Sequence, residues 1–476
     1  MQRNLYGNKK GDQEKSLPAI DSPSSPVYNN QGDNPMSAIP ASHVPIKRSN
    51  FRWVVAGLIF LIYTIAAADR ANIGVALPFI RKEFAMTNTQ AGALLSLFLL
   101  AYALAQLPSG FATSRFGVRK LFSVSMILTS VFTGLIGSSS SILMLKIYRF
   151  GLGLAEGPLP VGITTTINNW FPPHEKGTAA GIFLSAVKFG PVIVPPICAV
   201  IVAIWGWREI FYFFAIPGIV LAVIWYFFVT NHPSESRHCS PQELAYITGS
   251  SEAVTAKQSQ RPIRSMKLLD RLIRAKKIDL LTTNKKVFKS WNILGCSLSY
   301  CFQLGISNVL LAWIPTYLLT VKKFSIMNMG FVAAAPWVGA VIGNVMGGLL
   351  SDRFLNKRRK PGMMLSALAT AGMMYALINS PADPVQYGAL LFVTGILLSL
   401  GFSAYMAYSM GVTTKQTFPV ASSVVNMGGQ LGGALAPFVT GMLLDSYGWD
   451  YVFLFMAIGS LMSFLVLTTI AEPIND

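Results

Sequence analysis

Long apolar runs, separated by short polar connections, fill most of the chain between residues 50 and 472. A helix of about 20 apolar residues spans the hydrocarbon core of a membrane, and runs of this length recur along the sequence. The pattern predicts an all-α membrane protein with twelve transmembrane helices. We expect these helices at residues 53–80, 89–112, 120–137, 142–169, 177–204, 209–229, 291–319, 329–351, 362–379, 385–411, 419–444 and 450–471.

Polar stretches divide the chain into four parts. Residues 1–48 are rich in Asn, Gln, Ser, Pro and Lys, so we expect a disordered tail. This tail has no apolar core and is not expected to be a cleaved signal peptide. Two six-helix bundles are predicted at residues 49–230 and 290–476, and a central loop at residues 231–289 joins them.

Lysine and arginine side chains in the connections predict the orientation of the helices, because cytoplasmic loops carry an excess of them. One side of the membrane receives Lys47, Arg48, Arg52, Arg115, Arg119, Lys120, Lys176, Arg353 and the stretch "NKRRK" at 356–360. The other side receives Arg81, Lys82, Arg208, Lys322 and Lys323. We therefore expect both termini and the central loop in the cytoplasm.

The central loop contains the stretch "MKLLDRLIRAKKIDLL" at residues 266–281. Several of its leucine and isoleucine side chains fall on one helical face, with the arginines and lysines largely elsewhere. The pattern predicts a basic amphipathic helix on the membrane surface, with a solvated linker as the alternative.

The two halves of the sequence repeat each other. The stretch "GPVIVPPICAVIVAIWGWREIF" at 190–211 matches "GGALAPFVTGMLLDSYGWDYVF" at 432–453 in its Gly, Pro, Gly-Trp and Phe positions. A second match pairs residues 110–120 with residues 348–358. Repetition on this scale predicts two pseudo-symmetric bundles.

Composition supports this fold class and argues against several others. The chain is 52% hydrophobic and 12% charged, whereas soluble domains carry about 25% charged residues. The net charge of +18 is explained by loops beside an anionic leaflet, so nucleic-acid binding is not expected. The four cysteines form no CxxC pair, and we expect no disulfide, metal site or cofactor. A membrane enzyme is not expected either, because no nucleophile motif or His/Cys cluster lies near a helix end.

Charged side chains lie in the interior of the first, fourth and fifth apolar segments. Asp69 and Arg70 lie near the middle of the first segment, Arg149 and Glu156 lie in the fourth, and Lys188 lies in the fifth. Each such charge costs at least about 2.5–3.5 kcal/mol at the bilayer centre. These side chains must therefore face a polar interior or each other.

Two explanations account for these charges. In the first, Asp69–Arg70 and Arg149–Glu156 are salt bridges that hold the bundle together, although buried pairs are weak stabilisers. In the second, they form a proton site beside an anion site. A carboxylate in a low-dielectric site binds a proton more readily than one in water, and arginine offers a fork of donors to a substrate carboxylate. Lys188 is expected to face the cavity, because a site near mid-membrane makes snorkelling to the surface difficult.

Two six-helix bundles joined by a cytoplasmic loop resemble the major facilitator superfamily. The loop motif of that family, G-x-x-x-D-R-x-G-R-K, occurs here with Ser114 in place of the Asp, while the second copy keeps Asp352 and Arg353. In the family this loop is a cytoplasmic gate latch, so the resemblance implies a weakened charge network in the first copy. The matching residues of the first copy are Gly110, Arg115, Gly117, Arg119 and Lys120.

Three stretches resemble the anion:cation symporter family, which includes bacterial galactonate, glucarate and hexuronate transporters. They are "ADRANIGVALPFI", "YRFGLGLAEGPLPVGITTTINNWFPPHEKGTAAGIF" and "GWREIF". The resemblance implies that Asp69 and Glu156 carry protons during alternating access. For two of the matching pocket residues, Tyr102 and Asn426, ordinary helix packing is the alternative. The residues that match the family's substrate contacts are Arg70, Arg149, Tyr102 and Asn426.

The chain departs from the family pattern at two places. Ala66 and Ala67 stand where the family commonly has Asn-Tyr, and Val187 and Lys188 stand where it often has Gln-Tyr. The lost hydroxyl and amide groups would serve a polyhydroxylated substrate, and Lys188 adds a cation. We therefore expect an anion that is less hydroxylated or more strongly charged than a hexonate.

The function expected from the sequence is proton-coupled symport of an organic anion, either a carboxylate or a sugar acid. We expect a monomer in a bacterial inner membrane. Within transport, the alternative is an anion exchanger or a carrier driven by the membrane potential. A transporter-like nutrient sensor is the alternative from another class, and the short central loop argues against it.

Overall fold

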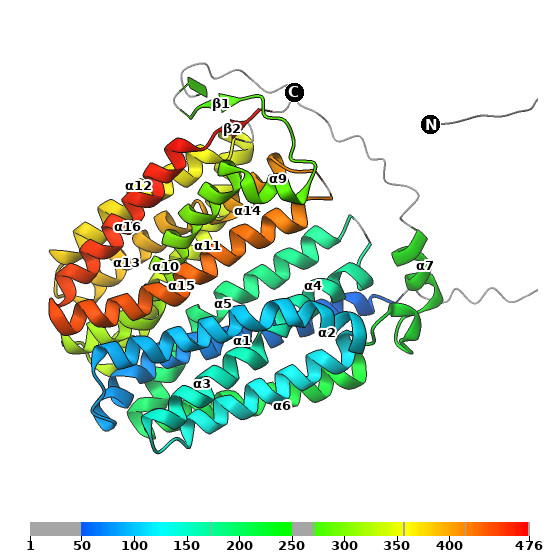
Figure 1. Ribbon diagram of the computed structural model, residues 1–476. Coiled ribbons are helices and arrows are strands. Elements are labelled where there is room, and N and C mark those ends of the chain that lie inside the picture. Colours follow the sequence, from blue (N-terminus) through cyan, green and yellow to red (C-terminus); the bar gives the residue numbers. More distant parts are fainter. Residues whose placement is uncertain are drawn as a thin grey trace, which may run out of the picture. The chain divides into compact units, whose positions relative to one another are not determined.

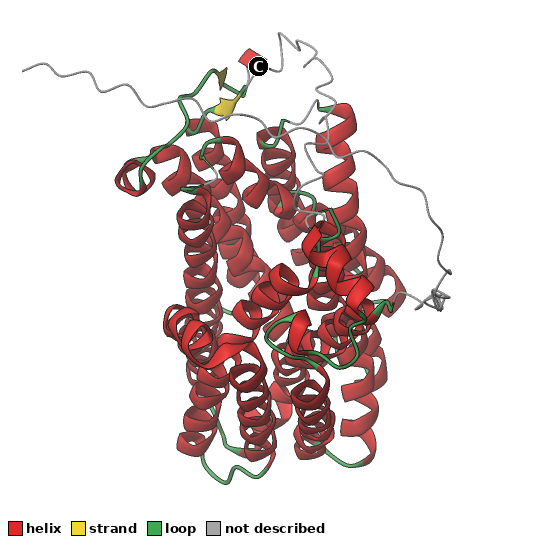
Figure 2. Cartoon of the chain, turned by 90° about the vertical axis from the view of Figure 1, so that its right-hand side faces the viewer, coloured by secondary structure: helices red, strands yellow, loops and turns green. Residues whose placement is uncertain are grey.

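The computed structural model describes residues 49–172, 174–249, 270–271, 273–355, 358–414 and 416–474. The predicted tail and the first part of the predicted helix at 266–281 lie outside these residues. Within them the chain is largely helical, and the long helices run roughly parallel to one another (Figure 2).

The first half of the chain forms one bundle (Figure 1). Its helices are α1 (Phe51–Glu83), α2 (Asn88–Gly137), α3 (Ile142–Glu156), α4 (Pro158–Trp170), α5 (Lys176–Ile204) and α6 (Trp207–Phe228). Two predicted segments, 89–112 and 120–137, are both contained in α2. This helix turns sharply at Gly117, whose φ of 75° lies in the left-handed region that favours glycine.

The second half forms the other bundle (Figure 1). A π-helical turn, η2 (Leu350–Phe354), extends its second helix. The helices are α10 (Trp291–Thr320), α11 (Ile326–Leu349), α12 (Lys360–Ile378), α13 (Pro384–Ser399), α14 (Phe402–Gly411), α15 (Phe418–Ser446) and α16 (Trp449–Thr469).

Eleven helical segments in the described part of the chain are long and apolar enough to cross a membrane. The predicted segment 142–169 is not among them, because it is broken after Gly157 into α3 and α4. Pro158 opens α4, and its ring nitrogen has no N–H with which to continue the hydrogen-bonding of α3. Since α3 and α4 follow each other along the chain as one span, the predicted architecture of twelve spans in two bundles is confirmed.

The sequence repeat is visible in the backbone. Gly206 and Gly448 precede α6 and α16, and their φ values are 101° and 89°. Gly190 of α5 lies against Ala67 of α1, and the equivalent Gly432 of α15 lies against α10. Both halves therefore use the same turn and the same close helix contact, as two pseudo-symmetric bundles require.

The helices end at two opposite sides of the bundles. We call the side at which α1 begins the linker end and the opposite side the distal end. The connections at the linker end include η1 (Pro233–Glu235), α7 (Pro241–Gly249) and α9 (Asn284–Lys289), all from the predicted central loop.

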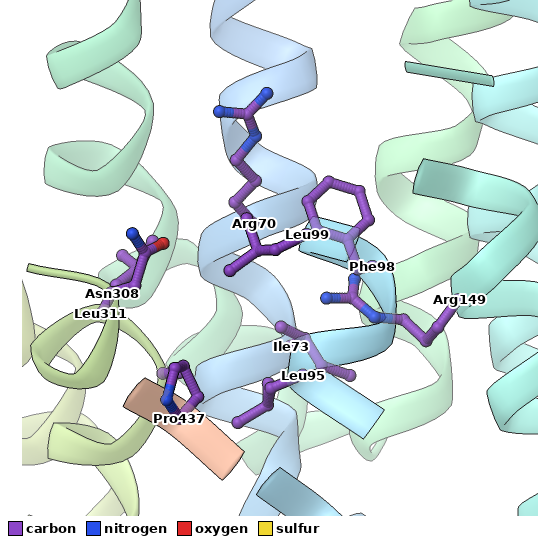
Figure 3. A pocket seen from close by; sticks show the side chains of 10 residues that line it. Arg70, Ile73, Leu95, Phe98, Leu99, Arg149, Asn308, Leu311 and Pro437 are labelled. Atoms are coloured by element: carbon purple, nitrogen blue, oxygen red, sulfur yellow. The ribbon is translucent and has the colours of Figure 1, made fainter. Parts of the chain in front are cut away.

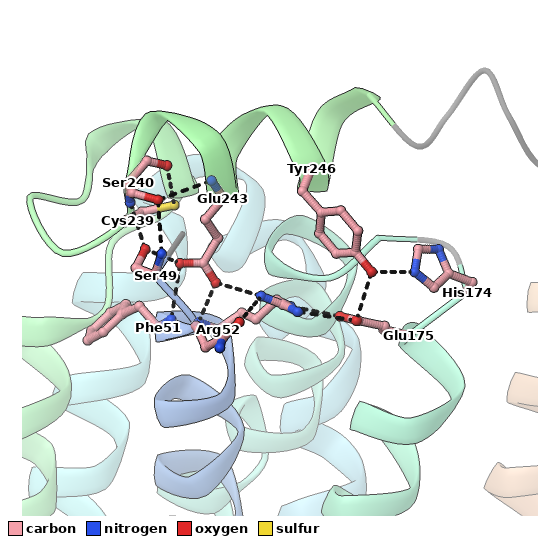
Figure 4. A network of polar contacts seen from close by, with 10 residues as sticks. Ser49, Phe51, Arg52, His174, Glu175, Cys239, Ser240, Glu243 and Tyr246 are labelled. Atoms are coloured by element: carbon pink, nitrogen blue, oxygen red, sulfur yellow. Dashed lines mark hydrogen bonds and ion pairs between the residues drawn. The ribbon is translucent and has the colours of Figure 1, made fainter. Parts of the chain in front are cut away.

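The first part of the central loop is anchored to the first bundle (Figure 4). The buried carboxylate of Glu243 in α7 accepts hydrogen bonds from the backbone N–H groups of Phe51 and Arg52. These groups lie in the first turn of α1, where N–H donors have no partner within the helix. Glu243 also forms an ion pair of 2.9 Å with the Arg52 guanidinium. Helix α7 therefore caps α1 with a negative charge.

Arg52 extends this network to the connection before α5. Its Nε lies 2.7 Å from Oε2 of Glu175, and the hydroxyl of Tyr246 in α7 donates to Oε1 of the same carboxylate. The hydrogen bond from Arg52 holds the pKa of Glu175 below its usual value. The network joins α1, α7 and the start of α5.

The last part of the central loop is anchored to the second bundle instead. Strand β1 (Ala275–Lys276) pairs in parallel with β2 (Glu472–Pro473), which follows α16. The N–H of Leu281 donates to the carbonyl oxygen of Val412. The predicted amphipathic helix therefore does not extend to residue 281, because this stretch exchanges its backbone hydrogen bonds with the second bundle.

Two buried charges hold this attachment in place. Lys360, at the start of α12, is fully buried and donates to the carbonyl oxygens of Ile273 and Ile470. The buried Glu472 accepts hydrogen bonds from the backbone N–H groups of Arg359 and Lys360. Each described part of the loop thus contacts its own bundle.

The two bundles contact each other along their distal halves. Gly74 of α1 lies against the backbone of Leu311 and Ala312 in α10, and Gly441 of α15 lies against the backbone of Asn88 in α2. A Cβ atom at either glycine would clash with these backbone atoms. Glycine therefore permits the close approach that closes the distal end.

Asp445 joins the bundles at the distal end through hydrogen bonds. Its carboxylate accepts from the backbone N–H and the side chain of both Asn88 and Thr89, at distances of 2.6–2.9 Å. These residues form the first turn of α2, which attracts negative charge. A carboxylate of the second bundle therefore caps a helix of the first.

The linker halves of the helices between the bundles pack less closely. A Cβ atom added at Gly110, Gly181 or Gly348 would meet no atom within 4 Å. Leu104 and Leu184 are 57% and 60% exposed. The structure therefore represents a state that is closed at the distal end and open toward the linker end.

Replacing Glu175 by glutamine tests the network around Arg52. We expect Glu175→Gln to lower the stability in detergent at pH 7 by about 1–2 kcal/mol, because a hydrogen bond to a charged group is lost. The folded-state pKa of Glu175 is depressed. Its stabilisation is therefore complete above the unfolded pKa of about 4.3 and disappears as the pH falls through the lower folded-state pKa.

The measurement is the thermal midpoint of both proteins from pH 3 to pH 7. The difference between them should disappear in acid. The control is Glu235→Gln, which changes an exposed carboxylate in η1. A Glu175→Gln protein as stable as the wild type at pH 7 would contradict the assigned role.

Replacing Asp445 by alanine tests the closure of the distal end. Because Asp445→Ala removes the hydrogen bonds between the bundles at the first turn of α2, with a net loss of about 1 kcal/mol, we expect the distal-open population to rise roughly fivefold. The readout is the reaction of a cysteine at Leu99 with a membrane-impermeant maleimide added on the distal side. Asp383→Ala is the matched control, because Asp383 caps α13 within its own bundle. Equal labelling in both variants would show that Asp445 does not hold the bundles together.

Candidate functional site

Glycine contacts in α3 bring its charged side chains toward α1. Gly153 lies against the backbone of Phe98 and Tyr102 in α2, and Gly157 lies against Ala105 and the carbonyl oxygen of Tyr102. Larger side chains would hold α3 away from α2. The close approach places the carboxylate at the end of α3 within reach of α1.

Arg70 of α1 and Glu156 of α3 form the central ion pair. Oε1 of Glu156 accepts hydrogen bonds from Arg70 Nε at 2.9 Å and from Arg70 Nη2 at 2.5 Å. Glu156 is fully buried, whereas the Arg70 side chain is 19% exposed. Within the described residues, Oε2 of Glu156 has no hydrogen-bond partner. The arginine of the pair is therefore partly exposed, and one oxygen of the carboxylate lacks a hydrogen bond.

This pairing differs from the salt bridges considered from the sequence. Asp69 and Arg70 are neighbours on one helix, so their side chains point in directions about 100° apart. Arg149 and Glu156 lie on one face of α3 but are about 10 Å apart along its axis. Among the ion pairs of the described chain, the one that involves these residues is Arg70–Glu156.

Asp69 is buried without an ion-pair partner among the described residues. Asn72 Nδ2 donates to its Oδ1 at 3.2 Å. Arg149 reaches only the backbone carbonyl of Asp69, at 3.4 Å, and its guanidinium lies 4.5 Å from the ring centroid of Phe98. The Nε of Arg149 has no hydrogen-bond partner in this part of the chain. A carboxylate and a guanidinium are thus held close together without a direct bond.

A pocket lies between the bundles on the distal side of the ion pair (Figure 3). Its free space is about 20 Å³, which is room for about one water molecule. Three polar side chains, those of Arg70, Arg149 and Asn308, contribute to a wall that is otherwise apolar. The lining residues are Arg70, Ile73, Leu95, Phe98, Leu99, Arg149, Asn308, Leu311, Ala312 and Pro437.

Asn308 was not among the residues expected from the sequence. It lies in α10, and its Nδ2 donates to the carbonyl oxygen of Leu304. Its place near the middle of the predicted helix 291–319 could have identified it as a candidate pocket residue. Many such residues only pack within their own bundle, as Gln303 does through its hydrogen bond to Ser460.

Tyr102 and Asn426, both expected in the substrate pocket, lie in different surroundings. Tyr102 is buried below the guanidinium of Arg70, which lies 4.5 Å from its ring centroid. This contact is a cation–π interaction and adds to the ion pair. Asn426 is half-buried in α15 and does not line the pocket in the described structure.

Lys188 extends from α5 toward the second bundle. Its Nζ lies 5.0 Å from the ring centroid of Phe402 in α14 and 5.8 Å from that of Trp337 in α11. The side chain is half-buried and near the middle of its helix. The structure therefore places this lysine between the bundles, and the two aromatic residues were not expected from the sequence.

The residues of the predicted gate motif lie at the linker end. Gly110 and Arg115 are exposed in the first copy, and Gly117 forms the turn described above. Arg119 donates to the carbonyl oxygen of Tyr226 in α6, so it binds within its own bundle.

The second copy of the motif contains a charge pair. Asp352 of η2 forms an ion pair of 2.8 Å with Arg359, and Arg353 is exposed. The acidic residue that the first copy lacks thus makes an ion pair in the second copy, where it joins the end of α11 to the start of α12.

The site shows no feature of a metal centre. The described residues contain no group of three or more His, Cys, Asp or Glu side chains that could hold a metal ion. All four cysteines are free thiols.

Comparison with known proteins gives relatives along most of the chain. Residues 59–410 and 386–475 match the Major Facilitator Superfamily. The probable sulfoacetate transporter SauU of Cupriavidus necator is 31% identical over 87% of this chain and 92% of its own length. The probable galactarate/D-glucarate transporter GudP of Bacillus subtilis is 27% identical over 88% and 92%. The hexuronate transporter of the same species is 26% identical over 87% and 92%.

Solved structures show the same fold at lower identity. A bacterial homologue of the human lysosomal transporter Spinster has a TM-score of 0.72 at 17% identity, over 89% of this chain and 97% of its own. The D-xylose-proton symporter has a TM-score of 0.67 at 17% identity, over 88% and 97%. The relatives are transporters rather than enzymes. The chain belongs to the Major Facilitator Superfamily and, within it, to the anion:cation symporter family.

Proposed function

We propose that this protein is a secondary transporter that moves a small organic anion together with protons. The observation that carries the proposal is the Arg70–Glu156 ion pair beside the unpaired carboxylate of Asp69. Both carboxylates are buried within the first bundle, and Arg70 lines the pocket between the two bundles, which are closed at one end. The names of the relatives support an acidic solute, since SauU is a probable sulfoacetate transporter and GudP a probable galactarate/D-glucarate transporter.

The ion pair supplies a direct route for coupling. An incoming anion can bind the exposed side of the Arg70 guanidinium, which offers a planar fork of donors. The anion then competes with Glu156 for the same N–H groups. Glu156 is fully buried and cannot remain charged without a partner at acceptable free energy, so it takes up a proton as the anion binds.

Asp69 provides a second proton site. Its carboxylate is held by Asn72 and lies beside the Arg149 guanidinium, which contacts its backbone carbonyl. Movement of Arg149 toward the carboxylate would favour the charged form and release the proton. Protonation and anion binding are thus linked through two arginines.

The difference in packing between the two ends of the bundles supports alternating access. In the present state the distal end is closed by the contacts of Gly74, Gly441 and Asp445, and the site opens toward the linker end. We assign the linker end to the cytoplasm, because most lysine and arginine residues of the connections lie there. Both termini would then be cytoplasmic, and the bacterial sources of the relatives favour a bacterial inner membrane.

Uptake into vesicles tests the coupling. The purified protein should accumulate a labelled anion such as sulfoacetate or galactarate at least tenfold more with an inward proton gradient than without it. Asp69→Asn and Glu156→Gln should remove this accumulation and retain counterflow of the anion, which needs no net proton movement. Glu209→Gln, an exposed change at the start of α6, is the control. Gradient-driven accumulation in both site variants would refute coupling through Asp69 and Glu156, wild-type uptake that does not depend on the gradient would refute proton coupling, and uptake that needs an anion inside the vesicle would indicate exchange instead.

Replacing Arg70 by lysine tests the anion anchor. Arg70→Lys keeps the charge but loses the planar fork, so we expect KM for the anion to rise about tenfold, equivalent to about 1.4 kcal/mol. Arg81→Lys near the end of the same helix should leave KM unchanged. An unchanged KM in Arg70→Lys would exclude a paired contact between this guanidinium and the substrate.

A further inference from the structure

Lys188, Lys322 and Lys360 are lysine side chains that are buried or half-buried in the bundles, and they differ in how their N–H donors are used. Lys360 donates to three backbone carbonyl oxygens, those of Ile273, Thr468 and Ile470. Lys322 contacts two aromatic rings and also donates to the carbonyl oxygens of Ser380 and Pro381. Both ammonium groups therefore have oxygen acceptors.

Lys188 has the aromatic contacts without the oxygen acceptors. Its Nζ lies against the rings of Phe402 and Trp337, and among the described residues it has no hydrogen-bond or ion-pair partner. An ammonium group carries three N–H donors, and ring faces compensate for lost water by only about 2 kcal/mol. The site is thus built to hold a cation while leaving its donors free.

The position of Lys188 relates it to the ion pair. Gly190 of α5 packs against Ala67 of α1, which sets the relative height of these two parallel helices. Arg70 lies three residues beyond Ala67 toward the distal end, and Lys188 lies two residues before Gly190 toward the linker end. At 1.5 Å per residue, the two cations are about 7–8 Å apart along the helix axes. Lys188 is therefore on the open side of Arg70, where a solute would enter.

The charges of the site leave one positive charge without a counterpart. Arg70, Arg149 and Lys188 carry three positive charges, and Asp69 and Glu156 carry two negative charges when ionised. A bound anion with one charge would balance the site with both carboxylates ionised. An anion with two charges would balance it only when one carboxylate is protonated, and this condition ties its binding to a proton.

We propose that Lys188, held by Trp337 and Phe402, is a second anion subsite, and that the transported solute is a small dianion bound at one end by Arg70 and at the other by Lys188. The inference rests on the proposed function, because it assigns the substrate class of the same site. The rings belong to the second bundle and the lysine to the first, so a solute at this subsite contacts both bundles. A solute with two acidic groups on a short carbon skeleton, such as a sulfonated carboxylate, meets these requirements.

Binding measurements on the full-length protein in detergent test the subsite without transport. The probes are sulfoacetate as the dianion and methanesulfonate as the matched monoanion, at a pH at which both are fully ionised. Binding can be followed by the fluorescence of the protein's tryptophans, among which Trp337 contacts Lys188, and confirmed by calorimetry. The wild type should bind the dianion at least tenfold more tightly than the monoanion.

Lys188→Gln should reduce this preference to about twofold or less, mainly through weaker binding of the dianion. Lys188→Arg should restore most of it. Lys322→Gln is the matched control, because it removes a lysine that also contacts two rings but already has oxygen acceptors. If Lys188→Gln does not fold, Trp337→Leu provides the second variant and should lower the preference severalfold by releasing the lysine.

The outcomes separate this proposal from proton coupling. An unchanged preference in Lys188→Gln, or an equal loss for both probes, would overturn the second subsite. A wild type that prefers the dianion but does not accumulate it under a proton gradient would refute the coupling and leave the subsite supported. A wild type that binds neither probe would overturn the subsite as proposed.

Discussion

A charge that has no partner in the hydrocarbon region of a membrane is costly, and this constraint organises the first bundle. Arg70 and Glu156 meet it by pairing across two helices, which requires the glycine contacts of α3 and its end at Gly157. Asp69 and Lys188 meet it less completely, through an amide and through aromatic rings. The fold therefore tolerates these groups in one arrangement while leaving each of them able to gain a better partner. That combination is what a site for mobile ions needs.

Much of the fold could be predicted, because membrane-spanning helices are specified by the length of their apolar runs. The repeat added the pairing of the halves, which the shared turn glycines Gly206 and Gly448 reproduce. The break between α3 and α4 was harder to foresee, since Pro158 within an apolar run can bend a helix or end it. The helix expected at 266–281 failed in its second part for another reason. Its backbone pairs with a segment almost 200 residues later, and no local pattern contains that information.

For the site, the sequence was informative about which residues matter and poor at predicting how they combine. Charges inside apolar segments are rare enough to be noticed without any structure. Their partners depend on helix rotation and on contacts between helices, which is why Arg70 pairs with Glu156 rather than with its neighbour. Trp337 and Phe402 gave no signal, because an aromatic residue that supports a cation looks in sequence like one that packs against lipid.

The attachment of each half of the central loop to its own bundle has a consequence for how the molecule is held together. The parts of the loop on either side of the stretch 250–269 make the contacts described above, each with its own bundle, so these contacts do not hold the bundles together. Their association must instead come from the noncovalent contact surface between them. A chain cut within this stretch would leave two related polypeptides, each with its own anchored loop segment, that could still recognise each other. In this respect the protein is organised as a heterodimer whose two subunits share one chain.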